Sequence, residues 1–324
     1  MHLATSLVRA VSTVAGSMSF LDEIHLEAQE AGLIEAVARG RTKPIFDWLM
    51  SAFSLQGISD QVALNYMKRH GPARWSSVQK SLNQRATCPK LLSYWAYDNC
   101  RYHKGCSTCS EPEHIDQCPV PRLHLRNGRL NQTAYSAFLF IRDLADNDIV
   151  GWIDRQLDNA TASSDCDLEA ARQEALIGPL RNIYGISDKV LTMTLSTLLM
   201  AAQGRAAWFE TGKSMIAIDT LVHNFLHRTG ILFDCGRSHA YGAACYQKGG
   251  CAEIIRGVSK RIDARTINPR FPAYFPRFFQ HAVWRFCALD GLNLCNGNRI
   301  DDRKPCQISY CHLSQKCQKK SLKA

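Results

Sequence analysis

The chain has 324 residues, of which 46% are hydrophobic and 21% charged, so it can bury one large core or two smaller ones. No apolar run approaches the roughly 20 residues that a membrane span needs, which excludes a transmembrane protein. The net charge is +10, and this balance favours a polyanionic partner such as nucleic acid, with a merely basic globular protein as the alternative.

The first elements in chain order are helical. We expect residues 1–44 to form an N-terminal helical extension, because Arg9 interrupts the apolar part that a signal peptide would need. Residues 45–71 have apolar side chains at helical spacing, a break at Gly57 and a capping position near Asp60. This pattern predicts a pair of helices.

Residues 72–125 form the least regular stretch and are interpreted as a cysteine-rich insertion. The chain has 14 cysteines, and without a secretory signal metal ligation explains their clustering better than disulfides do. A zinc knuckle that uses His114 is one interpretation of this segment. We prefer a second iron–sulfur cluster, with zinc as the alternative, bound by Cys100, Cys106, Cys109 and Cys118.

Residues 126–230 are predicted to be helical, with one tight turn between two helices. The first of these helices stops near Gly185, and Ser187 can cap the second. The backbone N–H groups of Gly185, Ile186 and Ser187 would then lie at a helix N-terminus, where a phosphate binds well. An ordinary helical corner is the alternative.

Two segments complete the chain. Residues 231–294 are expected to form helices that close a second domain, and residues 295–324 form a cysteine loop with a basic tail. Four thiolates in this loop suit a [4Fe–4S] cluster or zinc, namely Cys295, Cys306, Cys311 and Cys317. A looser set could be a ligand group or only core thiols, namely Cys235, His239, Cys245 and Cys251.

Four blocks of the sequence, in the same order, resemble the helix-hairpin-helix DNA glycosylase superfamily and its endonuclease III-like branch. The hairpin block matches at Gly185 and Lys189, and the block IAIDTLVHNFLHRTG places Asp219 on the family's catalytic aspartate. The early block FDWLMSAFSLQGISDQVA places Gln56 beside the extruded base, and DGLNLCNGNRIDDRKPCQISYCHLSQKC resembles the iron–sulfur segment. Ser187 stands where the family hairpin has a second glycine.

The resemblance implies an all-α fold with two helical domains, a helix-hairpin-helix motif, a C-terminal cluster loop and a cleft between the domains. It implies a base-excision repair glycosylase in which Asp219 stabilises the sugar cation and Lys189 supports AP lyase activity through a Schiff base. The partner would be double-stranded DNA, and we expect a monomer in the cytoplasm, associated with the nucleoid, or in another intracellular DNA-containing compartment. A non-catalytic metal-bearing DNA-binding protein and a zinc protein that binds RNA are the alternatives.

Overall fold

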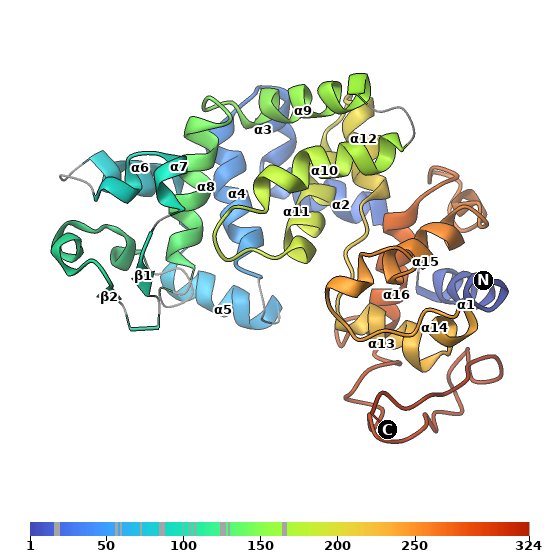
Figure 1. Cartoon of the computed structure of the whole chain (residues 1–324). Helices are drawn as coiled ribbons and strands as arrows, with labels where there is room; N and C mark the ends of the chain where they lie inside the picture. Colours follow the sequence, from blue (N-terminus) through green and yellow to red (C-terminus); the bar gives the residue numbers. More distant parts are fainter. Residues whose placement is uncertain are drawn as a thin grey trace. The chain divides into compact units, whose positions relative to one another are not determined.

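Most of the described chain is helical in its computed structural model, which confirms the predicted all-α class (Figure 1). Among the residues described, the only strands are β1 (Tyr102–His103) and β2 (Thr108–Cys109), which pair antiparallel. The structure describes residues 1–15, 20–55, 58, 60–71, 73–83, 88–98, 100–103, 105–106, 108–123, 128, 130–163 and 167–323.

The chain divides into two compact units. Unit 1 consists of Met1–His25 and Gly212–Ala324, and unit 2 consists of Leu26–Thr211. Residues 126–230 are predicted as one segment that contains both Lys189 and Asp219, whereas in the structure Lys189 belongs to unit 2 and Asp219 to unit 1.

Unit 1 is built around α1 and α16, which pack against each other. The apolar side chains of α1 recur at helical spacing, and Leu7, Val8 and Val11 are fully buried. The first residues are therefore helical, as predicted, but they form part of the core of this unit. Its elements are α1 (His2–Ala15), the start of α2 (Phe20–Glu30), α13 (Thr220–Arg228), α14 (Ile231–Asp234), η4 (Ala243–Cys245), α15 (Cys251–Ser259), η5 (Ala264–Thr266) and α16 (Pro276–Cys287).

Unit 2 surrounds α8 (Asn131–Asp143), in which nearly every residue is buried. Phe46, Trp75 and Phe138 pack ring to ring in its core, with the Trp75 and Phe138 centroids 4.3 Å apart. Its other helices are α3 (Leu33–Ala38), α4 (Thr42–Phe53), α5 (Asp60–His70), α6 (Trp75–Asn83), η1 (Pro89–Leu91), α7 (Tyr94–Tyr97), η2 (Pro112–Gln117), η3 (Val120–Arg122), α9 (Ile149–Ser163), α10 (Leu168–Leu180), α11 (Asp188–Ala201) and α12 (Ala206–Ser214), which reaches the boundary with unit 1.

Candidate functional site

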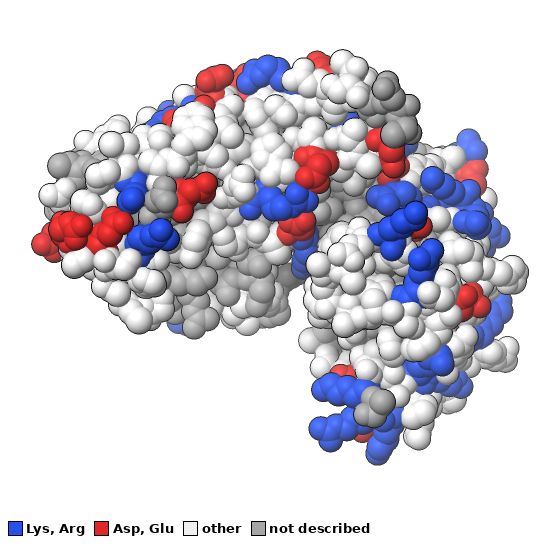
Figure 2. Space-filling view, in the orientation of Figure 1, with Lys and Arg blue, Asp and Glu red and all other residues white. Residues whose placement is uncertain are grey.

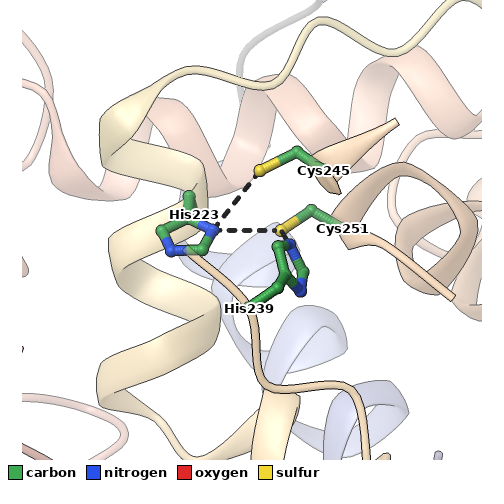
Figure 3. Close-up of side chains that lie close together, drawn as sticks. All are labelled: His223, His239, Cys245 and Cys251. Atoms are coloured by element: carbon green, nitrogen blue, oxygen red, sulfur yellow. Dashed lines mark hydrogen bonds between the residues drawn. The ribbon is translucent and has the colours of Figure 1, made fainter. Parts of the chain in front are cut away.

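Two histidines and two cysteines of unit 1 converge on one point (Figure 3). The Nδ1 atom of His223 lies 3.4 Å from the sulfur atoms of both Cys245 and Cys251, and Nε2 of His239 lies 3.4 Å from the Cys251 sulfur. All four ligand atoms lie within 4.8 Å of one another. Among the described residues, no other group of His, Cys, Asp or Glu is gathered so closely around a possible metal position.

The local sequence explains how the loop reaches this point. His223 lies on the buried face of α13, and Cys251 is the first residue of α15. Gly250, which precedes that helix, has backbone oxygens of Ala244 and Cys245 where any other residue would carry a Cβ atom. The chain can therefore fold back tightly enough to bring Cys245 beside Cys251 only because residue 250 is a glycine.

The donor set fits a metal ion. Bond lengths of about 2.3 Å to sulfur and 2.0–2.1 Å to nitrogen, arranged tetrahedrally, separate neighbouring ligand atoms by roughly 3.5 Å. The three observed sulfur–nitrogen distances of 3.4 Å are close to this value. Thus His223, His239, Cys245 and Cys251 could hold a metal ion.

This group differs from the looser set seen in the sequence by one member. The sulfur of Cys235 contacts the sulfur of Met1 at 3.6 Å instead, and His223 takes its place in the group. His223 is only 5% exposed and lies beside apolar buried residues of α13 such as Val222 and Phe225. A histidine at a buried helical position was the signal in the sequence that could have identified it.

The pKa values of the two cysteines of the group shift in opposite directions. A hydrogen bond from Cys251 lowers the pKa of Cys245, while the same bond together with burial raises the pKa of Cys251. The two histidines also help to lower the pKa of Cys245. The surroundings of Cys245 therefore favour the thiolate, which is the form that binds metals.

Asp219 lies four residues before His223, at the start of the same helix. Its carboxylate accepts a hydrogen bond of 2.9 Å from the N–H of Val222 and so caps α13. Its surroundings are also charged and polar. Burial lowers the pKa of Arg277 to about 10, and the negative charge of Asp219 opposes that lowering.

The metal-centre loop also supplies two tyrosines near Asp219. The hydroxyl of Tyr246 accepts a hydrogen bond of 2.9 Å from the N–H of Ile218 and donates one of 3.2 Å to the carbonyl of Ile218. Burial raises the pKa of Tyr241, and the charge of Asp219 raises it further. Two tyrosines from the segment that carries His239 and Cys245 therefore lie near Asp219 and the residue before it.

The opposite end of α13 holds the C-terminal cysteine loop. The N–H groups of Gln318 and Lys320 donate to the carbonyls of Thr229 and Arg228, at 3.2 and 2.8 Å. The Cys317 thiol interacts electrostatically with the other three cysteines of the predicted cluster, Cys295, Cys306 and Cys311. The structure therefore brings these four residues together.

A buried cation accompanies this cysteine group. Arg228 is 1% exposed, it pairs with Asp302, and its Nε and Nη1 atoms have no hydrogen-bond partner among the described residues. The pKa of Cys295 is lowered chiefly by a hydrogen bond from Cys287, and the charge of Arg228 lowers it further. A negatively charged cluster beside Arg228 would compensate this buried charge.

The predicted hairpin consists of α10, a turn and α11 in unit 2. Gly185 has a φ of +79°, a conformation that glycine adopts without strain, and Ser187 occupies the N-cap position as predicted, although its side chain makes no capping hydrogen bond. Thr133 donates to the carbonyl of Tyr184 at 2.8 Å, and Ser136 accepts from its N–H at 3.0 Å. The turn is thereby fixed to α8.

The ion pairs of the hairpin join Arg181 to two acidic residues. Asp188 pairs with Arg181 at 3.0 Å, and Arg181 also binds Glu174 at 2.8 Å. Lys189, on the first turn of α11, is half-buried. Gln56, the predicted wedge residue, lies outside the described residues.

The cysteines of residues 72–125 group differently from the predicted set. Cys118 interacts electrostatically with Cys100, Cys88 and Cys109, and Cys88 in turn with Cys100 and Cys109. Cys106 is exposed. Three of the four predicted residues therefore lie together, with Cys88 as their neighbour.

Comparisons with protein-family models, with curated proteins and with solved structures found no match to this chain. In the part of the chain that the structure describes, no helix has the length and apolar character to cross a bilayer.

Proposed function

We propose that this protein is a DNA N-glycosylase that extrudes a damaged or mismatched base and cleaves its N-glycosidic bond. The observation that carries the proposal is the position of Asp219: a half-buried carboxylate held at the N-cap of α13, beside buried Arg277 and at the end of an apolar segment. This residue is also the one that the sequence resemblance assigns to catalysis.

The proposed chemistry needs a fixed negative charge. Breaking the glycosidic bond develops positive charge on the deoxyribose, and a preorganised carboxylate stabilises that charge or orients the attacking water. The hydrogen bond from Val222 holds the Asp219 carboxylate in one orientation. Arg277, whose pKa of about 10 keeps it charged at neutral pH, offsets the repulsion between this carboxylate and nearby DNA phosphates.

The hairpin is the proposed phosphate contact. Its turn places Gly185, which is exposed, two residues before Ser187, the N-cap of α11, and the dipole at a helix N-terminus attracts an anion. Lys189 on this helix is the proposed nucleophile for AP lyase activity. Its amine would attack the sugar carbon, displace the base and leave a Schiff base.

The charge distribution supports a polyanionic partner. Unit 1 has 19 Lys and Arg residues against 9 Asp and Glu, whereas unit 2 has 20 of each, so the whole net charge of +10 belongs to unit 1. Figure 2 shows basic side chains outnumbering acidic ones over this unit in the face drawn. Such a surface attracts DNA through release of counterions.

Two metal centres are part of the proposal. Cys295, Cys306, Cys311 and Cys317 would hold a [4Fe–4S] cluster, and the grouping of these thiols, with Cys295 close to the charge of Arg228, fits that cluster. The cluster would fix the loop at the end of α13. His223, His239, Cys245 and Cys251 would hold zinc in a closed structural site.

The test is base release from duplexes that carry oxidised, deaminated, alkylated or mismatched bases. Asp219→Asn keeps a capping oxygen but removes the charge, so release should fall by about 100-fold or more while duplex binding persists. Asp167 caps α10 in the same way, with a hydrogen bond of 3.0 Å from Ala170, and Asp167→Asn is the matched control. Full activity of Asp219→Asn would refute the mechanism.

Two further outcomes separate the alternatives. Borohydride should trap a covalent protein–DNA adduct with the wild type but not with Lys189→Gln, because the Schiff base needs that amine. Tight duplex binding without an abasic product from any lesion would favour a non-catalytic DNA-binding protein.

A further inference from the structure

Unit 2 contains a four-cysteine group that is separate from both metal centres described above. Its members come from four places in the chain: before η1, after α7, on β2 and after η2. Cys88 and Cys118 are 7% and 8% exposed, and each interacts electrostatically with the other thiols of the group. The fold thus gathers Cys88, Cys100, Cys109 and Cys118.

The sulfur atoms of this group receive hydrogen bonds in a repeated pattern. The N–H of Glu111 donates to the sulfur of Cys109 at 3.4 Å. The N–H groups of Lys90 and Val120 donate in the same way to Cys88 and Cys118, so three of the four sulfurs accept from the second residue after them.

The fourth sulfur has a side-chain donor. The Nε2 atom of Gln132 lies 3.8 Å from the sulfur of Cys100 and also donates to the carbonyl of Tyr102 at 3.2 Å. Gln132 comes from the buried helix α8. Burial raises the pKa of Cys88 and Cys118, and the N–H donors directed at their sulfurs oppose that rise. Donors of this kind around every sulfur are typical of metal-bound thiolates.

The segment that carries these four cysteines has little regular secondary structure to hold it together. Among the described residues between η1 and η3, its elements are a four-residue helix, two strands of two residues each and one six-residue 3₁₀ helix. Segments with so little regular structure are commonly held by disulfides or metals, and all four cysteines are free thiols.

The spacing of the sulfurs indicates the kind of centre. Among the residues that the structure describes, only the group around His223 is gathered closely enough for a single ion. The four thiols of unit 2 are not gathered to that degree, and a multi-iron cluster is the centre whose thiolate ligands are held apart by the cluster itself.

We propose that Cys88, Cys100, Cys109 and Cys118 bind a second iron–sulfur cluster, of the [4Fe–4S] type, which holds the irregular segment of unit 2 against α8. Cys106, which is exposed, is not a ligand. This site does not depend on the proposed glycosylase activity.

The test counts iron, inorganic sulfide and zinc in the full-length protein purified without oxygen. With clusters at both four-cysteine groups, we expect about eight irons and eight sulfides per chain. Cys88→Ser should retain about four irons, because it removes one ligand of one cluster, whereas the matched control Cys106→Ser should retain about eight.

Two results would overturn the proposal. One is loss of iron in Cys106→Ser with none in Cys88→Ser. The other is a wild type with only about four irons, together with one zinc that Cys88→Ser removes.

A separate variant decides the matter if Cys88→Ser does not fold, as judged by its helical circular dichroism. The double variant Cys295→Ser, Cys317→Ser should keep about four irons in unit 2, and a preparation free of iron would refute the second cluster. Base release is measured independently. A protein with about eight irons that excises no base would contradict the glycosylase proposal and leave this one intact.

Discussion

Replacing His239 by alanine tests whether the group around His223 binds a metal. His239 is a half-exposed loop residue, so its removal costs little packing, but it supplies one of the four ligand atoms. If the group is only a hydrogen-bond network, the variant loses the contact of 3.4 Å between Nε2 and the Cys251 sulfur. That loss is worth about 1 kcal/mol.

A bound metal predicts a larger effect. Zinc present at about 1,000 times its dissociation constant stabilises the folded state by about 4 kcal/mol. At roughly 2–4 °C per kcal/mol, the variant should melt about 8–16 °C below the wild type, against about 2–4 °C for the network alone. The two explanations therefore differ enough to be separated by calorimetry.

The assay compares thermal unfolding and zinc content of the wild type, His239→Ala and the control His2→Ala, which changes an exposed histidine of α1 in the same unit. A zinc chelator should lower the melting temperature of the wild type toward that of His239→Ala and leave His239→Ala unchanged. A wild type without bound metal, melting within about 4 °C of His239→Ala, would refute the metal centre.

Three more predictions follow from individual residues. Burial lowers the pKa of His281 to about 3, so the unfolded chain binds a proton that the folded chain excludes, and stability should fall by about 1.4 kcal/mol per unit as pH drops from about 6.5 toward 3. His281→Gln should flatten that decline in urea titrations, and an unchanged slope would contradict the assignment. Gly185→Ala should lower the free energy of unfolding by about 1–2 kcal/mol and weaken duplex binding. Gly204→Ala, at a similar φ of +77°, should lower stability by the same amount but bind duplex normally. Equal duplex binding by the two variants would show that the hairpin does not contact DNA. Changing exposed Arg299 and Arg303 of unit 1 to Gln should reduce the slope of log K for duplex binding against log salt concentration by about 1–2. The same change at exposed Lys80 and Arg155 of unit 2 is the control and should leave this slope unchanged.

Local patterns in the sequence were sufficient for the secondary structure and for several site positions. Apolar spacing predicted an all-α protein, and Ser187 was recognisable as the start of a helix. These features depend on residues a few positions apart, because helical periodicity and capping are set within one or two turns. Gly185 was predicted at the turn for the same reason, since a tight turn requires its positive φ.

Only the tertiary structure decided which distant residues meet. It joined α1 to α16 in one core, placed Lys189 and Asp219 in different units, and replaced Cys235 by His223 and Cys106 by Cys88 in their respective groups. Spacing along the chain cannot distinguish such partners, because closing a longer loop costs only slightly more entropy and many pairings are therefore comparable. The choice among them is made by packing: the buried face of α13 directs His223 into its group, and the burial of Cys88 and Cys118 brings those thiols together.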